Sequence, residues 1–181
     1  MTFTLPNLTP PVVGNPLSQS YLYNQMYNPL GFLLNPPQAS IYSAANQPGA
    51  ANATNYQIPF DSTDYDNYGG HSTTVNNTRY TCQVPGLYQI HAHVTFAANA
   101  TGMRMVEIWV NGGVILGSRN AMAVTGASTT GLGMEANTYH RLNVGDYVEV
   151  NTQQWSGGTL AINGSSSTGQ TPMLQLLWVG M

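Results

Sequence analysis

Hydrophobic and polar side chains alternate along residues 87–96, which follow a turn at Pro85 and Gly86. Successive side chains of a strand point to opposite faces, so this period of two predicts a strand with one face in a core. The residues expected to face the core are Tyr88, Ile90, Ala92, Val94 and Phe96. The opposite face is expected to meet water or a partner and carries Leu87, Gln89, His91, His93 and Thr95.

Short apolar runs separated by Gly, Asn, Ser and Thr continue to the end of the chain and predict further strands. Asn111, Gly112 and Gly113 indicate a tight turn between two of them, because Asn and Gly tolerate positive φ. No long amphipathic helix interrupts this part, so an all-β antiparallel sandwich is favoured over an α/β fold. The strands predicted are 57–60, 79–84, 87–96, 103–110, 114–118, 120–124, 128–135, 147–152, 159–163 and 173–179.

The first 55 residues have a different composition from the rest. They contain no charged side chain, and eight of the eleven prolines lie within the first 48 positions. The prolines up to Pro16 favour an extended start, and Ser18 is a suitable N-cap for a short helix over about residues 17–34, stopped at Pro36 and Pro37.

A segment of this composition has no core of its own. It is either a disordered tail or an arm that becomes ordered when another surface covers its apolar residues. We expect an anchoring arm whose contact residues are Leu17, Tyr21, Leu22, Met26, Phe32, Leu33 and Leu34.

The run from Arg79 to Phe96, with its Pro-Gly-Leu-Tyr corner, resembles the signature of the complement 1q and tumour necrosis factor jelly-roll superfamily. Three more pieces resemble the family in the expected order: Asn67–Gly70, Leu142–Val148 and Leu174–Gly180. The resemblance covers residues 56–181 and implies a complement 1q-like jelly-roll domain there, preceded by the arm at residues 1–55. The collagen-like stalk of many animal relatives is absent, which argues against a complement-type role.

Relatives of this fold associate as trimers, so the resemblance implies a homotrimer. The closing strand has apolar side chains at both odd and even positions, so both of its faces are hydrophobic. Together with Leu87 it would leave hydrophobic groups outside a single core. We therefore expect strand 87–96 and the closing strand near the threefold axis. The predicted interface residues are Leu87, Gln89, His91, His93, Leu174, Leu176 and Trp178.

Charge is scarce: 6% of the 181 residues are charged, lysine is absent, and the net charge is −3. Four dispersed arginines form no basic stripe, so nucleic-acid binding is not expected. No window reaches the roughly 18 consecutive apolar residues of a membrane span. The N-terminus lacks the basic and apolar regions of a signal peptide, so we expect synthesis in a cytoplasm.

Candidate chemistry is sparse. Cys82 shares the parity of its apolar neighbours and is interpreted as a buried side chain. His91 and His93 have the spacing of two metal ligands, but no third ligand lies near in sequence. Only a ring of six imidazoles, two from each of three chains on a threefold axis, would make a convincing site. No nucleophile motif is present. We therefore expect no enzyme activity and no cofactor.

The arm also resembles short Leu/Tyr/Asn helices ending in Leu-Leu-Asn-Pro-Pro that precede jelly-roll heads in bacteriophage tail and fibre proteins. This resemblance suggests a structural protein on the exterior of a bacteriophage virion, either a minor tail or tail fibre protein or a capsid decoration. In this interpretation residues 1–55 bind other virion proteins, and the head contributes to adhesion to the host surface.

The alternative is a secreted or surface-displayed lectin-like module that binds a glycan or protein. An exposed indole with neighbouring amides suits stacking on a sugar and hydrogen bonding to it. The residues predicted to form this receptor loop are Gln153, Gln154 and Trp155. Packing of Trp155 in the core is the competing interpretation.

Overall fold

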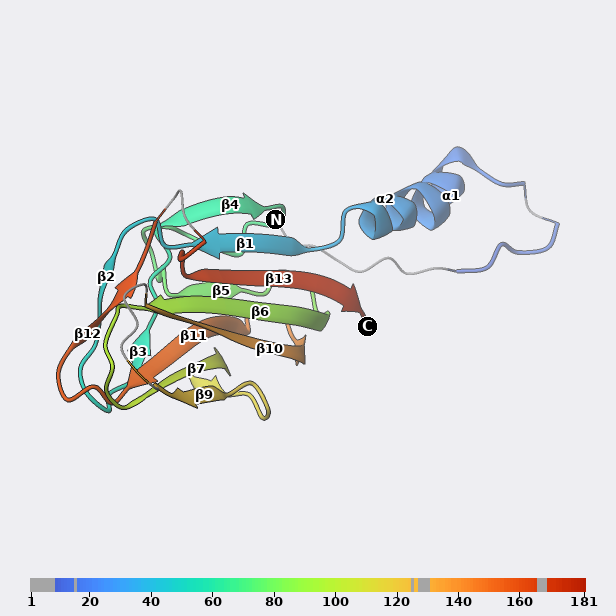
Figure 1. Ribbon diagram of the computed structural model, residues 1–181. Helices are drawn as coiled ribbons and strands as arrows, with labels where there is room; N and C mark the ends of the chain where they lie inside the picture. Colours follow the sequence, from blue (N-terminus) through green and yellow to red (C-terminus); the bar gives the residue numbers. More distant parts are fainter. Residues whose placement is uncertain (1–8, 15, 125, 127–130, 166–168) are drawn as a thin grey trace.

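The computed structural model describes residues 9–14, 16–124, 126, 131–165 and 169–181. A two-layered antiparallel β-sandwich forms the head, and a helical arm projects from one end of it, near the C-terminus (Figure 1). None of the helices in these ranges is long and apolar enough to cross a membrane.

The larger sheet has seven strands in the order β2-β12-β6-β13-β1-β4, and β10 pairs with β6 along its other edge. All pairs in this sheet are antiparallel. The central strand β6 (Gly86–Phe96) begins at the predicted turn. The others are β1 (Gln38–Tyr42), β2 (Gln47–Ala50), β4 (Ser62–Asp66), β10 (Leu132–Leu142), β12 (Leu160–Asn163) and β13 (Met173–Gly180).

The smaller sheet has six strands in the order β3-β11-β7-β8, with β5 also on β11 and β9 also on β7. Its connection from β7 to β8 is the predicted turn, and Asn111 there has φ of 51°. Its strands are β3 (Tyr56–Gln57), β5 (Arg79–Thr81), β7 (Met103–Val110), β8 (Gly113–Val114), β9 (Asn120–Ala123) and β11 (Tyr147–Gln154).

The core lies between the two sheets, and the alternation along β6 is confirmed. All five apolar residues predicted to face inward from β6 are fully buried. Cys82 is buried as predicted, and its thiol donates to the carbonyl oxygen of Val84 at 3.0 Å. Burial raises the pKa of this thiol, which keeps it un-ionised and poorly reactive.

The head begins earlier than predicted. β1 pairs with both β13 and β4, and its residues Ala39 and Ile41 are fully buried in the core. β2 pairs with β12. Residues 38–50 are therefore part of the sandwich, so the arm ends near Pro37 and not at residue 55. The sequence concealed these strands because they are short, lack charge and lie close to prolines.

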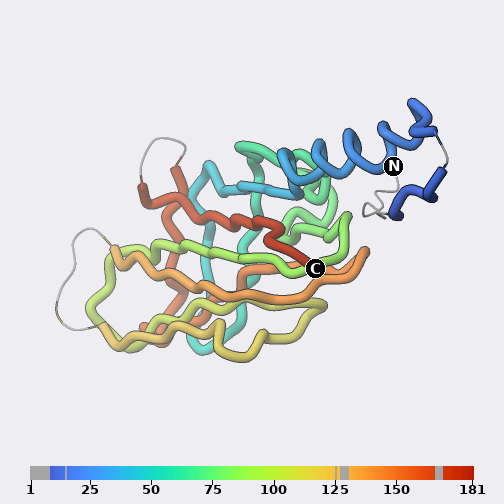
Figure 2. The backbone as a smooth tube through the Cα atoms, turned by 90° about the vertical axis from the view of Figure 1, so that its right-hand side faces the viewer, coloured from blue at the N-terminus to red at the C-terminus, as the bar shows by residue number. Residues whose placement is uncertain are grey.

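The arm is one continuous helical segment made of α1 (Gln19–Leu22), the π-helical turn η1 (Tyr23–Tyr27) and α2 (Asn28–Leu34). Ser18 is the N-cap, as expected, and its hydroxyl accepts a hydrogen bond from the backbone N–H of Tyr21 at 3.1 Å. The helix continues through Pro29 because the wide π turn directly before it accommodates a ring that lacks an N–H. Figure 2 shows residues 9–14 turning back beside the helix.

Trp178 joins the arm to the head. Its ring meets the ring of Phe32 edge to face, with centroids 4.9 Å apart. Its indole nitrogen donates to the carbonyl oxygen of Pro85 at 3.1 Å, and its backbone nitrogen donates to that of Pro37 at 2.8 Å. The end of the closing strand therefore contacts both the base of the arm and the turn that begins β6.

The close approach of Trp178 explains why residue 86 of the Pro-Gly turn is a glycine. A Cβ at Gly86 would lie 2.1 Å from the indole nitrogen of Trp178 and 2.6 Å from the carbonyl oxygen of Gly180. We predict that Gly86→Ala destabilises the fold by about 1–3 kcal/mol, the usual range for overpacking. Urea denaturation measures this change. Gly180→Ala is the matched control, because a Cβ there meets nothing within 4 Å. Equal stability of the two variants would contradict the proposed close contact.

Candidate functional site

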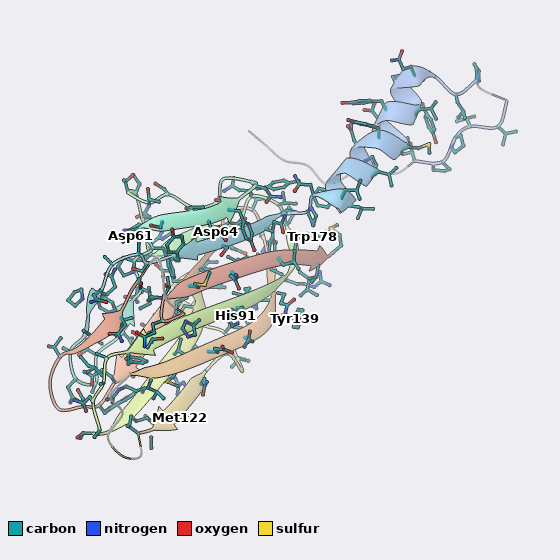
Figure 3. The ribbon with its side chains drawn as sticks, turned by 45° about the horizontal axis from the view of Figure 1, so that its top comes forward. Asp61, Asp64, His91, Met122, Tyr139 and Trp178 are labelled. Atoms are coloured by element: carbon teal, nitrogen blue, oxygen red, sulfur yellow. The ribbon has the colours of Figure 1, made fainter. Side chains whose placement is uncertain are left out.

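The candidate site is the outer face of the larger sheet, the face directed away from the core. Its middle is formed by β1, β13, β6 and β10, whose registers align outward side chains in rows. One row contains Gln38, Leu177, Gln89 and Tyr139; the next contains Ser40, Gln175, His91 and Asn137; the third contains Tyr42, Met173, His93 and Glu135. Figure 3 shows His91 and Tyr139 on neighbouring strands of this sheet.

Apolar and aromatic groups are exposed in and beside these rows. Leu177 is 40% exposed and Tyr139 is 61% exposed. Val179 lies further along β13 and Tyr65 lies on β4, and both are also exposed. A continuous sheet face with large exposed apolar side chains is unusual for a protein surface that meets only water.

The outer face of the smaller sheet carries two carboxylates paired within the chain, and Val114 of β8 is 45% exposed there. Glu107 accepts a hydrogen bond from Nε of Arg119 at 2.5 Å and one from the indole nitrogen of Trp109 at 2.9 Å. Glu149 accepts one from the hydroxyl of Thr78 at 2.8 Å. Arg79 lies 3.6 Å from Glu149. Both carboxylates are thereby buried and paired within the chain.

Four of the predicted interface residues lie on the outer face of the larger sheet. Gln89 is exposed, and Leu87, His91 and His93 are half-buried. Sequence reasoning missed Leu177, Val179 and Tyr139, which are more exposed. The predicted strand ended at residue 135, whereas β10 continues to Leu142. Extending the alternation of side chains to Leu142 would have revealed the outward residues of β10.

Leu174 and Leu176 were wrongly assigned to the interface. Both are buried in the core, at 0% and 2% exposure. The closing strand is apolar on both parities, so the sequence did not show which set faces inward. Pairing with β6 decides it, since Leu174 is opposite the inward Ala92 and Leu176 is opposite the inward Ile90. Trp178 is also not on the outer face, because it packs against the arm and the Pro85 turn.

The arm presents most of its predicted contact residues to the outside. Leu17, Leu22, Met26, Leu33 and Leu34 are between 39% and 85% exposed. The other two predicted residues make contacts within the chain: the hydroxyl of Tyr21 donates to the carbonyl oxygen of Thr9 at 2.7 Å, and Phe32 meets Trp178. Leu30 is a further exposed residue, at 54%.

The predicted receptor loop is not a loop of free polar groups. Gln153 and Gln154 belong to β11, and Gln154 is fully buried. Its side-chain nitrogen donates to the carbonyl oxygens of Ala50 at 3.0 Å and Gly158 at 2.6 Å, and its oxygen accepts from the N–H of Ser156 at 2.6 Å. Gln154 therefore holds the following turn in place, and Trp155 is half-buried.

His91 and His93 lie beside an open hollow of about 430 Å³ on the outer face. Asp64 of β4 and Glu135 of β10 also line it, and no arginine does. Within the described ranges no group of three or more His, Cys, Asp or Glu side chains is arranged to hold a metal ion. The two other histidines, His71 and His140, are elsewhere in the head.

Comparison with known proteins supports the fold and not a family. No protein-family model matches the chain, and no curated protein matches it. Among solved structures, the globular domain of zebrafish complement 1qA protein superposes with a TM-score of 0.51 and 13% identity, over 79% of this chain and 97% of that one. Murine APRIL superposes with a TM-score of 0.54 and 12% identity, over 79% of this chain and 98% of that one.

The head is a complement 1q-type jelly roll. The jelly-roll fold that the sequence resemblance implied is therefore confirmed. The 79% of the chain that superposes is close to the fraction from Gln38 to the C-terminus. Neither neighbour is a bacteriophage protein.

The position of Gln154 generates a prediction. Gln154→Ala would leave buried carbonyl and N–H groups without partners, so we expect a loss of about 2–4 kcal/mol in unfolding free energy. Gln153→Ala is the control, because its side chain is half-exposed and, among the described residues, bonds only to Asn55. Thermal denaturation of both variants measures the difference. A Gln154→Ala variant as stable as the control would restore this residue to the candidate receptor surface.

Proposed function

We propose that the chain is a non-enzymatic structural and binding protein that forms a homotrimer through the outer face of its larger sheet. The observation that carries the proposal is the group of exposed apolar side chains on the outer face of the larger sheet. Leu177, Val179 and Tyr139 are exposed there, and Leu177 and Tyr139 lie on either side of Gln89 of the central strand β6. In a chain with so few charges, a second copy is the simplest cover for such a face.

The trimer agrees with the fold and with the chemistry of the surface. Domains of this jelly-roll type are typically homotrimers. Gln89 and Gln175 supply donors and acceptors between the apolar side chains, as specific interfaces require. Each pair of subunits is expected to bury at least about 1,200–2,000 Å² in total, the size of a standard specific interface.

We further propose that the arm attaches this trimer to a larger particle, and that the particle is a bacteriophage virion. The support is the exposed, uncharged surface of the helix together with its resemblance to arms of phage tail and fibre proteins. The chain would then be an exterior appendage, a tail component or a capsid decoration, with the head directed toward the host surface. The lectin-like alternative loses support, since Gln154 is buried and Trp155 is half-buried.

The trimer is tested by the mass of the protein in solution. We expect light scattering at micromolar concentration to give three times the chain mass of 19.4 kDa. Leu177→Glu places a charge in the interface and should raise the dissociation constant of the trimer at least about tenfold. Leu116→Glu is the matched control, because Leu116 is 94% exposed on a loop of the smaller sheet and should not affect assembly. A folded wild-type monomer would contradict the proposal.

The anchoring role is tested by incorporation into particles. Leu30 and Leu33 are exposed on the arm, away from the Phe32 contact with the head. The double variant Leu30→Gln/Leu33→Gln keeps good helix formers and should remain folded and trimeric. We expect it to disappear from purified virions, as judged by immunoblotting, while Leu116→Gln stays in them. Normal incorporation of the double variant would exclude this surface as the anchor, and absence of the wild-type chain from all virion fractions would reject the virion proposal.

A further inference from the structure

We propose that His91 and His93 form a site for a divalent first-row transition-metal ion that is shared between copies of the chain. The proposal rests on the self-association inferred above, because each chain supplies only part of the ligand set. Three observations support it: the position of the two imidazoles, the hydrogen bonds of their Nδ1 atoms, and the charge around them.

Both imidazoles belong to the outer face of β6. The residues are two positions apart, so their side chains leave the strand in the same direction. Both are half-buried and line the 430 Å³ hollow, so they are accessible from the face that we propose to meet other copies. β6 is central in the sheet and hydrogen-bonded along both edges, which gives the pair a rigid base.

The hydrogen bonds fix the protonation of both rings. Nδ1 of His93 lies 3.1 Å from the backbone carbonyl oxygen of Thr171, and a carbonyl only accepts, so this Nδ1 carries the proton. Nδ1 of His91 lies 2.6 Å from the side-chain oxygen of Asn137, which is likewise an acceptor. In the neutral rings the lone pair is then on Nε2 in both cases. An Nδ1–H held by an oxygen and an unprotonated Nε2 is the usual arrangement of a metal-binding histidine.

Neither Nε2 atom has a hydrogen-bond partner in the described part of the chain. The charges around the hollow favour a cation. Asp64 and Glu135 line it, and no Arg side chain does. Imidazole nitrogen is a preferred ligand of Zn²⁺, Ni²⁺, Cu²⁺ and Fe²⁺, whereas Mg²⁺ and Ca²⁺ prefer oxygen, so the ion belongs to the first-row transition series.

Two nitrogens do not complete a protein metal site, and the described residues of one chain contain no third ligand in reach. A symmetric assembly repeats every ligand. If the outer faces meet around a threefold axis, three copies supply six imidazole nitrogens, enough for an octahedral ion. A single ion would then bridge three copies, and its binding would stabilise the assembly by mass action.

The test uses the full chain, stripped of metal with EDTA and then supplied with NiCl₂ or ZnCl₂. We expect about one bound ion per three chains by elemental analysis. We also expect a melting temperature raised by roughly 5 °C or more. His91→Gln and His93→Gln should each lose most of the bound metal and the thermal shift. His140→Gln is the matched control and should retain both, because its side chain is on the other face of β10.

The possible outcomes separate this inference from the proposed assembly. A trimer that retains no metal and shows no thermal shift would overturn the shared site and leave the trimer intact. A monomer with or without metal would overturn both. One ion per chain, or metal binding unchanged in His91→Gln and His93→Gln, would overturn the assignment of the ligands. A monomer that becomes a trimer when metal is added would support it.

Discussion

The register of β6 is the constraint on which the rest of the head depends. This strand pairs with β10 along one edge and with β13 and β12 along the other. A shift of one residue would move every inward side chain to the outer face. The same register that buries Tyr88 and Ile90 therefore places Gln89, His91 and His93 outside. The core and the candidate site are two faces of the same strand, so any change in the register of β6 would alter both.

The two sheets differ in how their charged side chains are paired. The chain has four arginines and seven carboxylates, and two ion pairs lie on the smaller sheet. Burying Glu107 is possible because Arg119, Trp109 and Asn151 all donate to it. The outer face of the larger sheet presents glutamines, histidines and apolar side chains, with Asp64 and Glu135 beside the hollow. A carboxylate paired within its own chain suits a surface that meets water, whereas exposed apolar and amide side chains suit a face that another protein covers.

The sequence predicted well what depends on local period. The alternation from Tyr88 to Phe96, the N-cap at Ser18 and the Asn111 turn each appear in the structure where a local pattern placed them. It failed where tertiary pairing decides. Leu174 and Leu176 could not be distinguished from Leu177 by pattern, because both parities of the closing strand are apolar. Gln154 looked like a surface amide, and only the approach of Ala50 and Gly158 makes it a buried one.

The base of the arm is attached to β13 and β6, the same two strands that form the middle of the outer face. Trp178, near the end of β13, contacts Phe32 of the arm and bonds to Pro85 at the start of β6. β13 also carries Leu177, and β6 also carries His91. The base of the arm is thus fixed to the strands that the proposed trimer brings together. Assembly would position three arms at one end of the head, so a helix too small to bind strongly alone would act as one of three linked contacts.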